Sequence, residues 1–428
     1  MLHLFLIGVV LILSLKADVQ LIKKENSDSN TTLLVIAGIH GNEPGGYFAA
    51  SVLATHYTIT SKNLWIVPNL NKESILNNSR GIHGDMNRKF SLIKEKDKDK
   101  PIIEEIKKII LSKKVSLVLN LHDGHGFYRK ENQGSIFNPT AWGQTCVIDQ
   151  CNLNQNQPFG NLNTIALSVK NNINKKLLKQ HHSFDVKNTN TQYEDEAMQL
   201  SLTYFAVTNN KPAFAVETSK NLSSLAQKVF YQLLAIEEYM KIMGITYKRD
   251  FTLNEEEISK IIINYGTLLI NKNILLNLSD IKKSLSYIPI KSKSNEYRFT
   301  HILGNIKKVR GQYLVYIGNQ KVTTLKPQYF KMSENCREEL TLEVDGKLVK
   351  VGKTSDIYVN DDFKVVSSKN FRVNVIGFYS KNLLDEAGIR ISLKDLNRNF
   401  AVDKHNKVYR VEFYANNEFC SMIMVHFK

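Results

Sequence analysis

The sequence predicts an α/β domain, in which helices flank a mixed sheet, followed by a small middle domain with strands and a C-terminal all-β sandwich of the immunoglobulin-like type. Three observations predict this order. Short apolar runs alternate with longer amphipathic ones from Thr31 to Met243, the composition shifts after Met243, and alternating strand patterns separated by turn residues recur from Glu334 onward. Alternating strands and helices are typical of a sheet that helices cover, and many short strands in succession are typical of a sandwich. We expect domains at 18–244, 245–333 and 334–428.

The first domain is expected to alternate buried strands with helices. Short apolar runs indicate strands, and apolar residues at helical spacing over longer stretches indicate helices. Pro101 suits a first helical turn, because proline lacks the N–H group that this turn leaves unpaired. The expected strands are Leu33–Ile39, Leu64–Val67, Val115–Leu121 and Ala213–Val216, and the expected helices are Tyr47–Ala54, Pro101–Leu111, Ile165–Leu178 and Leu225–Met243.

Hairpin signals mark the two later domains. The run Tyr313–Val322 reads as strand, Gly-Asn turn and strand, and Asp345-Gly346 lies between the runs Leu340–Val344 and Leu348–Val351. Such dipeptides suit tight hairpin turns, because Gly, Asn and Asp tolerate the positive φ angles that these turns require. Further strands are expected at Phe363–Val366, Arg372–Ile376 and Val408–Phe413.

Residues 1–17 predict an export signal. The apolar run Leu4–Leu15 is short for a helix that spans a bilayer, so a cleaved signal peptide is expected. His3 is the only ionisable side chain before the run, whereas such signals usually begin with positive charge, and an uncleaved anchor is therefore the alternative. In either case the folded part lies outside the cytoplasm. We expect a periplasmic protein with no stable membrane span after signal cleavage.

The formal net charge of +16 favours an anionic partner. For an exported protein, this partner is expected to be cell-wall polymer or a membrane surface, and not nucleic acid. Because the lysines are spread along the chain, a merely solvated basic surface is an equal alternative.

Four cysteines fit an oxidising compartment without requiring one. Cys146 and Cys151 are close enough in sequence to bridge, whereas Cys336 and Cys420 are far apart. The sequence leaves open whether Cys146 and Cys151 are bonded.

The segment Ile39–Gly46 places His40 and Glu43 directly after a predicted strand, where one tight turn brings the two side chains together. Imidazole and carboxylate are zinc ligands, and a catalytic zinc needs a third protein ligand while leaving one position for water. His122 is the expected third ligand, because it follows the apolar run of another predicted strand; His125 is an alternative. The carboxyl ends of strands form the binding crevice in open α/β sheets.

Three further polar residues are expected to differ in their surroundings. Asp123 is expected to orient a ligand through a hydrogen bond. His181 and His182 follow a predicted helix in a lysine-rich stretch, so both are expected to be solvated.

Two further segments supply charged groups. In Arg80–Phe90, Arg88 offers a rigid planar fork that suits a substrate carboxylate, and Arg80 is a candidate to stabilise an oxyanion beside the metal. The alternative for this segment is a surface loop with ordinary salt bridges. Glu217 ends the apolar strand Ala213–Val216 and would take a proton from the attacking water and pass it to the leaving amine. Capping of the following helix is the alternative role for Glu217.

In chain order, His-x-x-Glu, Arg, Asn-Arg, a histidine after a strand and a glutamate at a strand end resemble the M14, or carboxypeptidase A-like, zinc carboxypeptidases over Thr31–Met243. The resemblance implies one Zn²⁺ per chain and a peptidase of this type. It implies that His40, Glu43 and His122 are the metal ligands, Arg80 the electrophilic arginine, Asn87 and Arg88 the clamp for the terminal carboxylate, and Glu217 the general base.

Within that family, the export signal and the two added C-terminal modules are similar to the cell-shape-determining murein D,L-carboxypeptidases of helical bacteria. This implies cleavage of peptidoglycan stem peptides from tripeptide to dipeptide with release of meso-diaminopimelate, and an effect on cell shape. Other cell-shape proteins are possible partners of the C-terminal domains. Trp142, Thr203 and Tyr204 are expected to help line the pocket, and Tyr193 and Tyr204 are equal candidates for the family's substrate-gating tyrosine.

One further motif and two other functions compete with this interpretation. Asp395–Phe400 spells the commoner family form of the clamp, but it follows Glu217 inside the predicted β module, so Arg88 is preferred to Arg398. An M14-type deacylase of an acyl-amino acid is disfavoured by the export signal. A non-catalytic wall-binding scaffold is disfavoured by the intact set of ligands, base and arginines.

Overall fold

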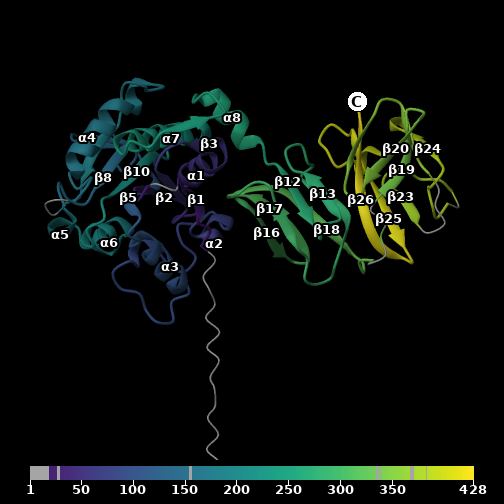
Figure 1. Cartoon of the computed structure of the whole chain (residues 1–428), viewed down its shortest axis with the longest axis horizontal. Coiled ribbons are helices and arrows are strands. Elements are labelled where there is room, and N and C mark those ends of the chain that lie inside the picture. The colour runs from purple at the N-terminus through teal and green to yellow at the C-terminus, as the bar shows by residue number, and fades with distance from the viewer. Residues whose placement is uncertain are drawn as a thin grey trace, which may run out of the picture. The chain divides into compact units, whose positions relative to one another are not determined.

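The computed structural model describes residues 19–428 except 27–28, 154–156, 334–335, 337–338, 367–370 and 382 (Figure 1). The predicted signal peptide, residues 1–17, lies outside the described residues. The chain divides into two units, Met1–Glu255 and Glu256–Lys428. In the part of the chain that the structure describes, no helix is both long and apolar enough to cross a membrane.

A seven-stranded mixed sheet organises the first unit, in the order β1-β4-β2-β5-β10-β8-β9. The central strands β4, β2, β5 and β10 are parallel, whereas β1 and β8 pair antiparallel with β4 and β10. The central strands are almost wholly apolar because helices cover both faces. The strands are β1 Ile22–Lys24, β2 Thr32–Ile36, β4 Asn63–Val67, β5 Val115–Gly124, β8 Thr145–Ile148, β9 Asp185–Asn188 and β10 Ala213–Ser219.

Helices α1, α4 and α7 pack together on one face of this sheet, and α3 and α6 lie on the other (Figure 1). In α3 the buried isoleucines recur at helical spacing and Pro101 sits in the first turn, as predicted. The helices are α1 Pro44–His56, α2 Lys72–Leu76, α3 Lys100–Ile110, α4 Leu162–Ile173, α5 Thr191–Glu194, α6 Leu202–Thr208 and α7 Leu225–Ile242. The 3₁₀ turns are η1 Met86–Arg88, η2 Gln180–His182 and η3 Met198–Leu200. Two short strand pairs complete the unit: β3 Tyr57–Ile59 with β11 Tyr247–Arg249, and β6 Phe127–Tyr128 with β7 Phe137–Asn138.

The end of α4 differs from the prediction, which continued this helix to Leu178. The helix stops at Ile173, and the side chain of Asn174 then pairs with the backbone of Phe184: its amide donates to the carbonyl and its oxygen accepts from the N–H. This exchange turns the chain back toward β9.

The second unit begins with α8 and two small sheets. These sheets have the orders β13-β12-β15 and β14-β18-β17-β16, and the predicted Gly-Asn turn joins β17 to β18. The elements are α8 Glu255–Ile263, β12 Thr267–Ile270, β13 Ile274–Asn277, β14 Ser284–Ile290, β15 Tyr297–Phe299, β16 Gly304–Val309, β17 Gln312–Ile317 and β18 Gln320–Tyr329.

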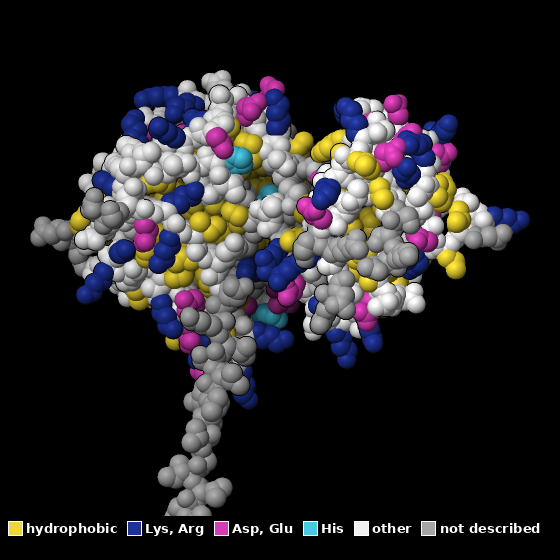
Figure 2. All heavy atoms as spheres, turned by 45° about the vertical axis from the view of Figure 1, so that its right-hand side comes forward, with side chains coloured by type: hydrophobic (Ala, Val, Ile, Leu, Met, Phe, Trp, Pro, Cys, Tyr) yellow, Lys and Arg dark blue, Asp and Glu magenta, His cyan; other side chains and the backbone are white. Residues whose placement is uncertain are grey.

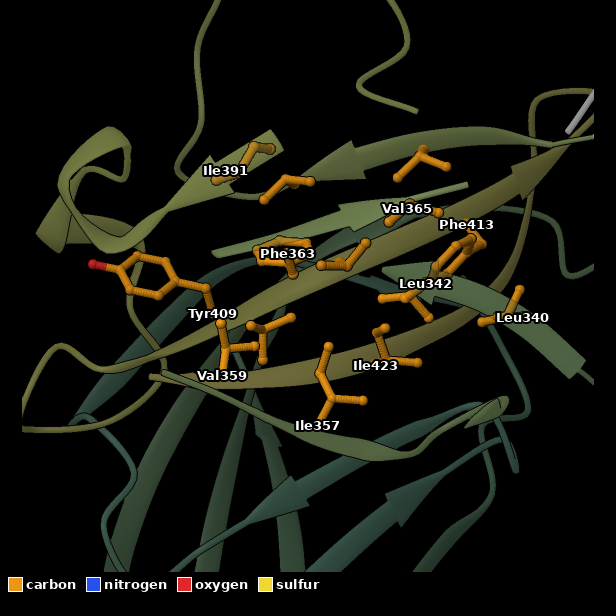
Figure 3. Close-up of a cluster of buried hydrophobic side chains, with 14 of the residues drawn as sticks. Leu340, Leu342, Ile357, Val359, Phe363, Val365, Ile391, Tyr409, Phe413 and Ile423 are labelled. Atoms are coloured by element: carbon orange, nitrogen blue, oxygen red, sulfur yellow. The ribbon is translucent and has the colours of Figure 1, made fainter. Parts of the chain in front are cut away.

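The rest of the second unit is a sandwich of two four-stranded sheets, β20-β19-β22-β24 and β21-β26-β25-β23. Figure 3 shows apolar side chains from both sheets meeting between them, with Phe363 and Leu342 facing Tyr409 and Phe413. The predicted Asp345-Gly346 turn is present, with φ angles of 49° and 78°. The strands are β19 Glu339–Val344, β20 Lys347–Gly352, β21 Asp356–Val359, β22 Asp362–Val365, β23 Arg372–Val375, β24 Arg390–Ser392, β25 Val408–Ala415 and β26 Glu418–Phe427, with 3₁₀ turns η4 Leu393–Asp395 and η5 Arg398–Phe400.

The cysteines pair differently from what sequence proximity suggests. Cys336 and Cys420 form a disulfide, although 84 positions separate them. Cys146 and Cys151 are both free thiols. Cys146 points into the core from β8, where burial raises its pKa to about 12, whereas Cys151 is exposed. One thiol is buried and the other is exposed, so closeness in sequence does not pair them.

Basic side chains are spread over the visible face of both units, with acidic ones among them (Figure 2). The face shown has no single basic surface that collects the net charge of +16. This distribution agrees with a solvated basic surface.

We predict that reduction of the disulfide destabilises the second unit. A cross-link across 84 residues is expected to contribute about 4 kcal/mol by restricting the unfolded chain. In calorimetry of the full chain, the transition of the second unit should shift to lower temperature with reductant or in Cys420→Ser, while that of the first unit stays in place. Equal transitions with and without reductant would contradict this.

Candidate metal centre and substrate pocket

The loop after β2 and the end of β5 bring three predicted metal ligands together. His40 and Glu43 lie between β2 and α1, and His122 lies in the last part of β5. The Glu43 carboxylate lies between the two rings: Oε1 is 3.0 Å from Nδ1 of His40, and Oε2 is 2.8 Å from Nδ1 of His122. All three side chains are buried, and one ligand atom of each lies within 4.8 Å of the others.

These three residues fit a bound divalent cation. Nδ1 of His40 is buried and faces Glu43 Oε1 without the alignment of a hydrogen bond, as expected of a nitrogen that coordinates a metal. Burial alone would raise the pKa of Glu43, but the adjacent His40 and His122 lower it well below its usual value, so it is an anionic ligand. Two imidazoles and one carboxylate form the donor set of catalytic sites that leave one position open.

A surrounding set of hydrogen bonds fixes the ligands. Asp85 accepts from Nε2 of His40 at 2.8 Å, which leaves Nδ1 as the coordinating nitrogen. Arg80 donates from Nε to the other Asp85 oxygen at 2.9 Å and also lies 3.4 Å from Glu43. Gln232, on α7, donates to the backbone carbonyl of His122 at 2.7 Å. The ring of His40 and the backbone of His122 are therefore fixed from outside the centre.

Asp123 holds the start of α1 against the end of β5. Its carboxylate accepts from the N–H of Gly45 at 2.8 Å and from the hydroxyl of Thr218 at 2.5 Å, and its own N–H donates to Glu43 at 3.3 Å. A Cβ atom at Gly45 would lie 2.3 Å from an Asp123 oxygen, so only glycine fits there. The expectation that Asp123 orients a ligand agrees with these contacts.

A cavity of about 240 Å³ opens beside the three ligands. Its lining comes entirely from the first unit and combines the metal ligands with cationic and amide groups. The lining residues are His40, Glu43, Arg80, Asn87, Arg88, Asn120, His122, Asp123, Gly124, His125, Trp142, Val147, Met198, Thr203, Ala215, Glu217 and Lys220.

Asn87 and Arg88 are fixed at one side of the cavity. Asn87 accepts from the N–H of Leu202 through its side-chain oxygen at 3.0 Å, so its amide N–H groups remain to face a ligand. Arg88 donates from Nη1 to the Asn87 carbonyl at 3.0 Å. Arg398, from the alternative clamp motif, lies in turn η5 of the second unit.

The predicted pocket residues divide into two groups. Trp142 and Thr203 line the cavity, whereas Tyr204 does not. Tyr204 contributes its backbone N–H to the cap of α6. Tyr193 is 83% exposed and also lies outside the lining.

Glu217 stands beside His122, because β5 and β10 pair in parallel with these two residues as partners. Burial raises the pKa of Glu217 to about 7; His122 opposes this rise, and the Glu43 carboxylate adds to it. A bound divalent cation would lower this pKa again. A carboxylate at the edge of a metal site has the position of a general base.

Two site residues, Asp85 and Lys220, have no role that the sequence pattern indicates. Asp85 lies inside the segment Arg80–Phe90, but its pairing with His40 depends on how the loops fold together, which spacing in the sequence does not reveal. Lys220 lies 3.4 Å from Glu43 and lines the cavity, three positions after Glu217. Its only signal was its place just past a strand end.

The prediction for His182 was wrong. It is 3% exposed, stacks on Phe127 with ring centroids 5.8 Å apart and bonds the hydroxyl of Tyr231 at 3.0 Å. Burial lowers its pKa to about 4, so it is a neutral core residue. His181, next to it, is exposed as expected.

Comparison with known proteins gives a family for most of the chain. A family model described as a carboxypeptidase controlling helical cell shape, catalytic, matches residues 2–264. A second, described as the C-terminal domain of metallo-carboxypeptidase, matches residues 333–428. No curated protein matches the chain.

Solved structures of the cell shape determinant protein Csd4 from Helicobacter pylori match nearly the full length. The apo form aligns with a TM-score of 0.90 and 35% identity over 96% of this chain and 100% of that chain. The tripeptide-bound form gives 0.89 and 35% over 96% and 100%. The mDAP-bound form, described as a D,L-carboxypeptidase, gives 0.90 and 35% over 95% and 100%.

We predict that His122→Ala abolishes stoichiometric metal binding, whereas Glu217→Gln retains it. His122 supplies one of the three ligand atoms, while Glu217 stands beside them and changes only in charge. Metal content by mass spectrometry after dialysis against trace metal checks this. A His122→Ala variant that kept a full equivalent of metal would contradict the assignment.

Proposed function

The chain belongs to the family of carboxypeptidases that control helical cell shape, and we propose that it is a zinc-dependent D,L-carboxypeptidase that shortens peptidoglycan stem peptides from tripeptide to dipeptide with release of meso-diaminopimelate. The observation that carries the proposal is the convergence, in one cavity, of a His-Glu-His centre, a glutamate base and two arginines. The related tripeptide-bound and mDAP-bound structures support this substrate.

His40, Glu43 and His122 would hold the zinc ion, which supplies Lewis acidity to the scissile carbonyl and lowers the pKa of water. Two imidazoles and a carboxylate favour zinc among the common divalent ions, with metal supply as the competing factor. Asp85 keeps the His40 ring in the tautomer that leaves Nδ1 free for the metal.

Glu217 takes the proton of the attacking water and returns it to the amine of the leaving residue. Its carboxylate stands at the strand edge beside His122 and lines the same cavity as the metal ligands, which is the position that both transfers require. Arg80 stabilises the negative charge that develops on the carbonyl oxygen; the bond to Asp85 fixes its guanidinium.

Asn87 and Arg88 hold the terminal carboxylate of the substrate, which makes the enzyme act at the chain end. The guanidinium accepts a carboxylate in two parallel hydrogen bonds, and the Asn87 amide adds a donor beside it. Trp142 forms a further wall, packed on the ammonium of Lys187 at 4.4 Å.

The compartment and partners follow from the same function. A peptidase acting on the cell wall works outside the cytoplasm, and the Cys336–Cys420 disulfide fits an oxidising periplasm reached through an export signal at residues 1–17. We propose that segments 245–333 and 334–428 place the enzyme on the wall or bind other cell-shape proteins. The likeness to a peptidase over the whole length favours this function over a deacylase or a scaffold.

The direct test incubates the purified protein with muropeptides that carry tri-, tetra- and pentapeptide stems, with and without a chelator, and measures the products by mass. We expect loss of one diaminopimelate from tripeptides, abolished by the chelator and restored by zinc. Absence of cleavage of every stem would reject the proposed function.

A second prediction separates the two arginine motifs. Arg88→Ala should reduce kcat/KM on tripeptide by about ten- to a hundredfold, chiefly through KM, because a charge-assisted pair to the substrate carboxylate is lost. Arg398→Ala, in the second unit, is the matched control and should leave kcat/KM within about twofold. The reverse pattern would transfer the clamp to Arg398.

A further inference from the structure

One cation of the cavity, Lys220, has no part in the reaction described above. Its N–H donates to the carbonyl of Gly124 at 2.7 Å, which continues the parallel pairing of β10 with β5 just past the ends of both strands. Its side chain is 35% exposed and lines the cavity. An anchored backbone therefore presents a partly exposed ammonium group to the substrate pocket.

This ammonium group lies at the metal centre. Nζ of Lys220 is 3.4 Å from Oε1 of Glu43, and Nη1 of Arg80 is equally far from that oxygen. Arg80 has a second carboxylate partner, Asp85, at 2.9 Å. Among the residues that the structure describes, Glu43 is the only carboxylate that forms an ion pair with Lys220. Because a well-formed charged hydrogen bond measures about 2.8 Å, this longer contact leaves Lys220 with donors for a second anion.

Lys220 and Arg88 stand on different walls of the cavity. Arg88 donates to the carbonyl of Asn87, whose side chain is bonded to the N–H of Leu202 at the start of α6. Lys220 is fixed instead beside the end of β5. When the terminal carboxylate of a substrate lies on Arg88 and the scissile carbonyl at the metal centre, the acyl side of the substrate continues beyond the centre, away from Arg88. Lys220, which faces the metal ligand Glu43 from its own wall, is placed to meet that side.

The proposed substrate carries a free anion on its acyl side. In a peptidoglycan stem peptide, the side-chain carboxyl group of D-glutamate forms the bond to diaminopimelate, so the α-carboxylate of this glutamate stays free a few bonds from the scissile carbonyl. A peptide that is linked through the α-carboxyl group has no anion at this position. An ammonium group beside the metal centre is within reach of such a carboxylate and would bind it through a charge-assisted hydrogen bond.

We propose that Lys220 binds the free α-carboxylate of the γ-linked D-glutamate, so that the enzyme selects stem peptides in which this group is neither amidated nor part of the scissile bond. The inference rests on the proposed function and adds the group that is recognised on the acyl side of the bond. Arg88 and Lys220 then hold the substrate from both sides of the metal centre.

Three tripeptides isolate this contact. They are the stem tripeptide itself, the same peptide with the α-carboxylate of glutamate amidated, and the same peptide with the distal carboxylate of diaminopimelate amidated. For the unaltered enzyme we expect kcat/KM to fall about tenfold or more when the glutamate is amidated, mainly through KM, because a charged hydrogen bond is lost. Dissociation constants measured by calorimetry with Glu217→Gln, which should bind without turnover, should change by a similar factor.

The variants test whether Lys220 makes the contact. Lys220→Met removes the charge, keeps the length of the side chain and should bring the ratio of kcat/KM for the free and the glutamate-amidated tripeptide close to one. Lys220→Arg keeps a cation and should keep a preference for the free carboxylate. Lys248→Met removes the same charge from the exposed strand β11, outside the cavity lining, and should leave the ratio unchanged. A merely structural role of Lys220 would lower activity on both tripeptides together and preserve their ratio.

The outcomes separate the inference from the proposed function. If the unaltered enzyme cleaves the free and the glutamate-amidated tripeptide equally well, the inference fails and the proposed function stands. A ratio that persists in Lys220→Met, or in Lys220→Gln if the first variant does not fold, overturns it as well. So does a Lys220→Met variant that loses only its preference for the free distal carboxylate of diaminopimelate, since Lys220 would then contact the leaving residue. Failure of the unaltered enzyme on every tripeptide rejects both.

Discussion

The parallel pairing of β2, β5 and β10 is the constraint on which the site depends. Backbone hydrogen bonds fix the register of β10 against β5, and this register alone makes Glu217 the neighbour of His122. The same edge carries the loop from β2 to α1 that holds His40 and Glu43. A slip of one residue would turn Glu217 to the opposite face of the sheet and separate the carboxylate from the ligands. The apolar side chains that both helical layers bury are therefore what keep the catalytic groups in place, since they define the register.

Around the metal centre, buried charge is tolerated because each charged group has a specific partner. Glu43 lies within reach of two histidines, Arg80 and Lys220, and Asp85 spans His40 and Arg80. Removing one partner leaves another charge buried and unpaired, which costs more than the lost contact itself.

Much of this arrangement could be predicted from the sequence, and the failures have physical causes. Apolar runs and strand-end position located His40, Glu43, His122 and Glu217, because chemistry at strand ends interrupts an otherwise apolar pattern. The hairpin turns followed from their dipeptides. Pairings between segments did not follow: Asp85 with His40, Asn174 with Phe184, and Cys336 with Cys420 each depend on tertiary closure. His182 failed for a related reason, because a lysine-rich neighbourhood in sequence says nothing of the aromatic side chains, Phe127 and Tyr231, that the fold packs around it.

The disulfide between Cys336 and Cys420 affects how the sandwich withstands cleavage by proteases. It joins the start of the sandwich to its last strand, so that residues 336–420 form one closed covalent ring. The exposed turns of the sandwich, such as the one at Asp345-Gly346, lie within this ring. A protease that cuts one of these turns opens the ring but releases no fragment, because the disulfide still joins the two pieces covalently. A single cut within residues 336–420 therefore leaves the linked sandwich in one covalent piece, whereas the same cut would divide an unlinked chain in two.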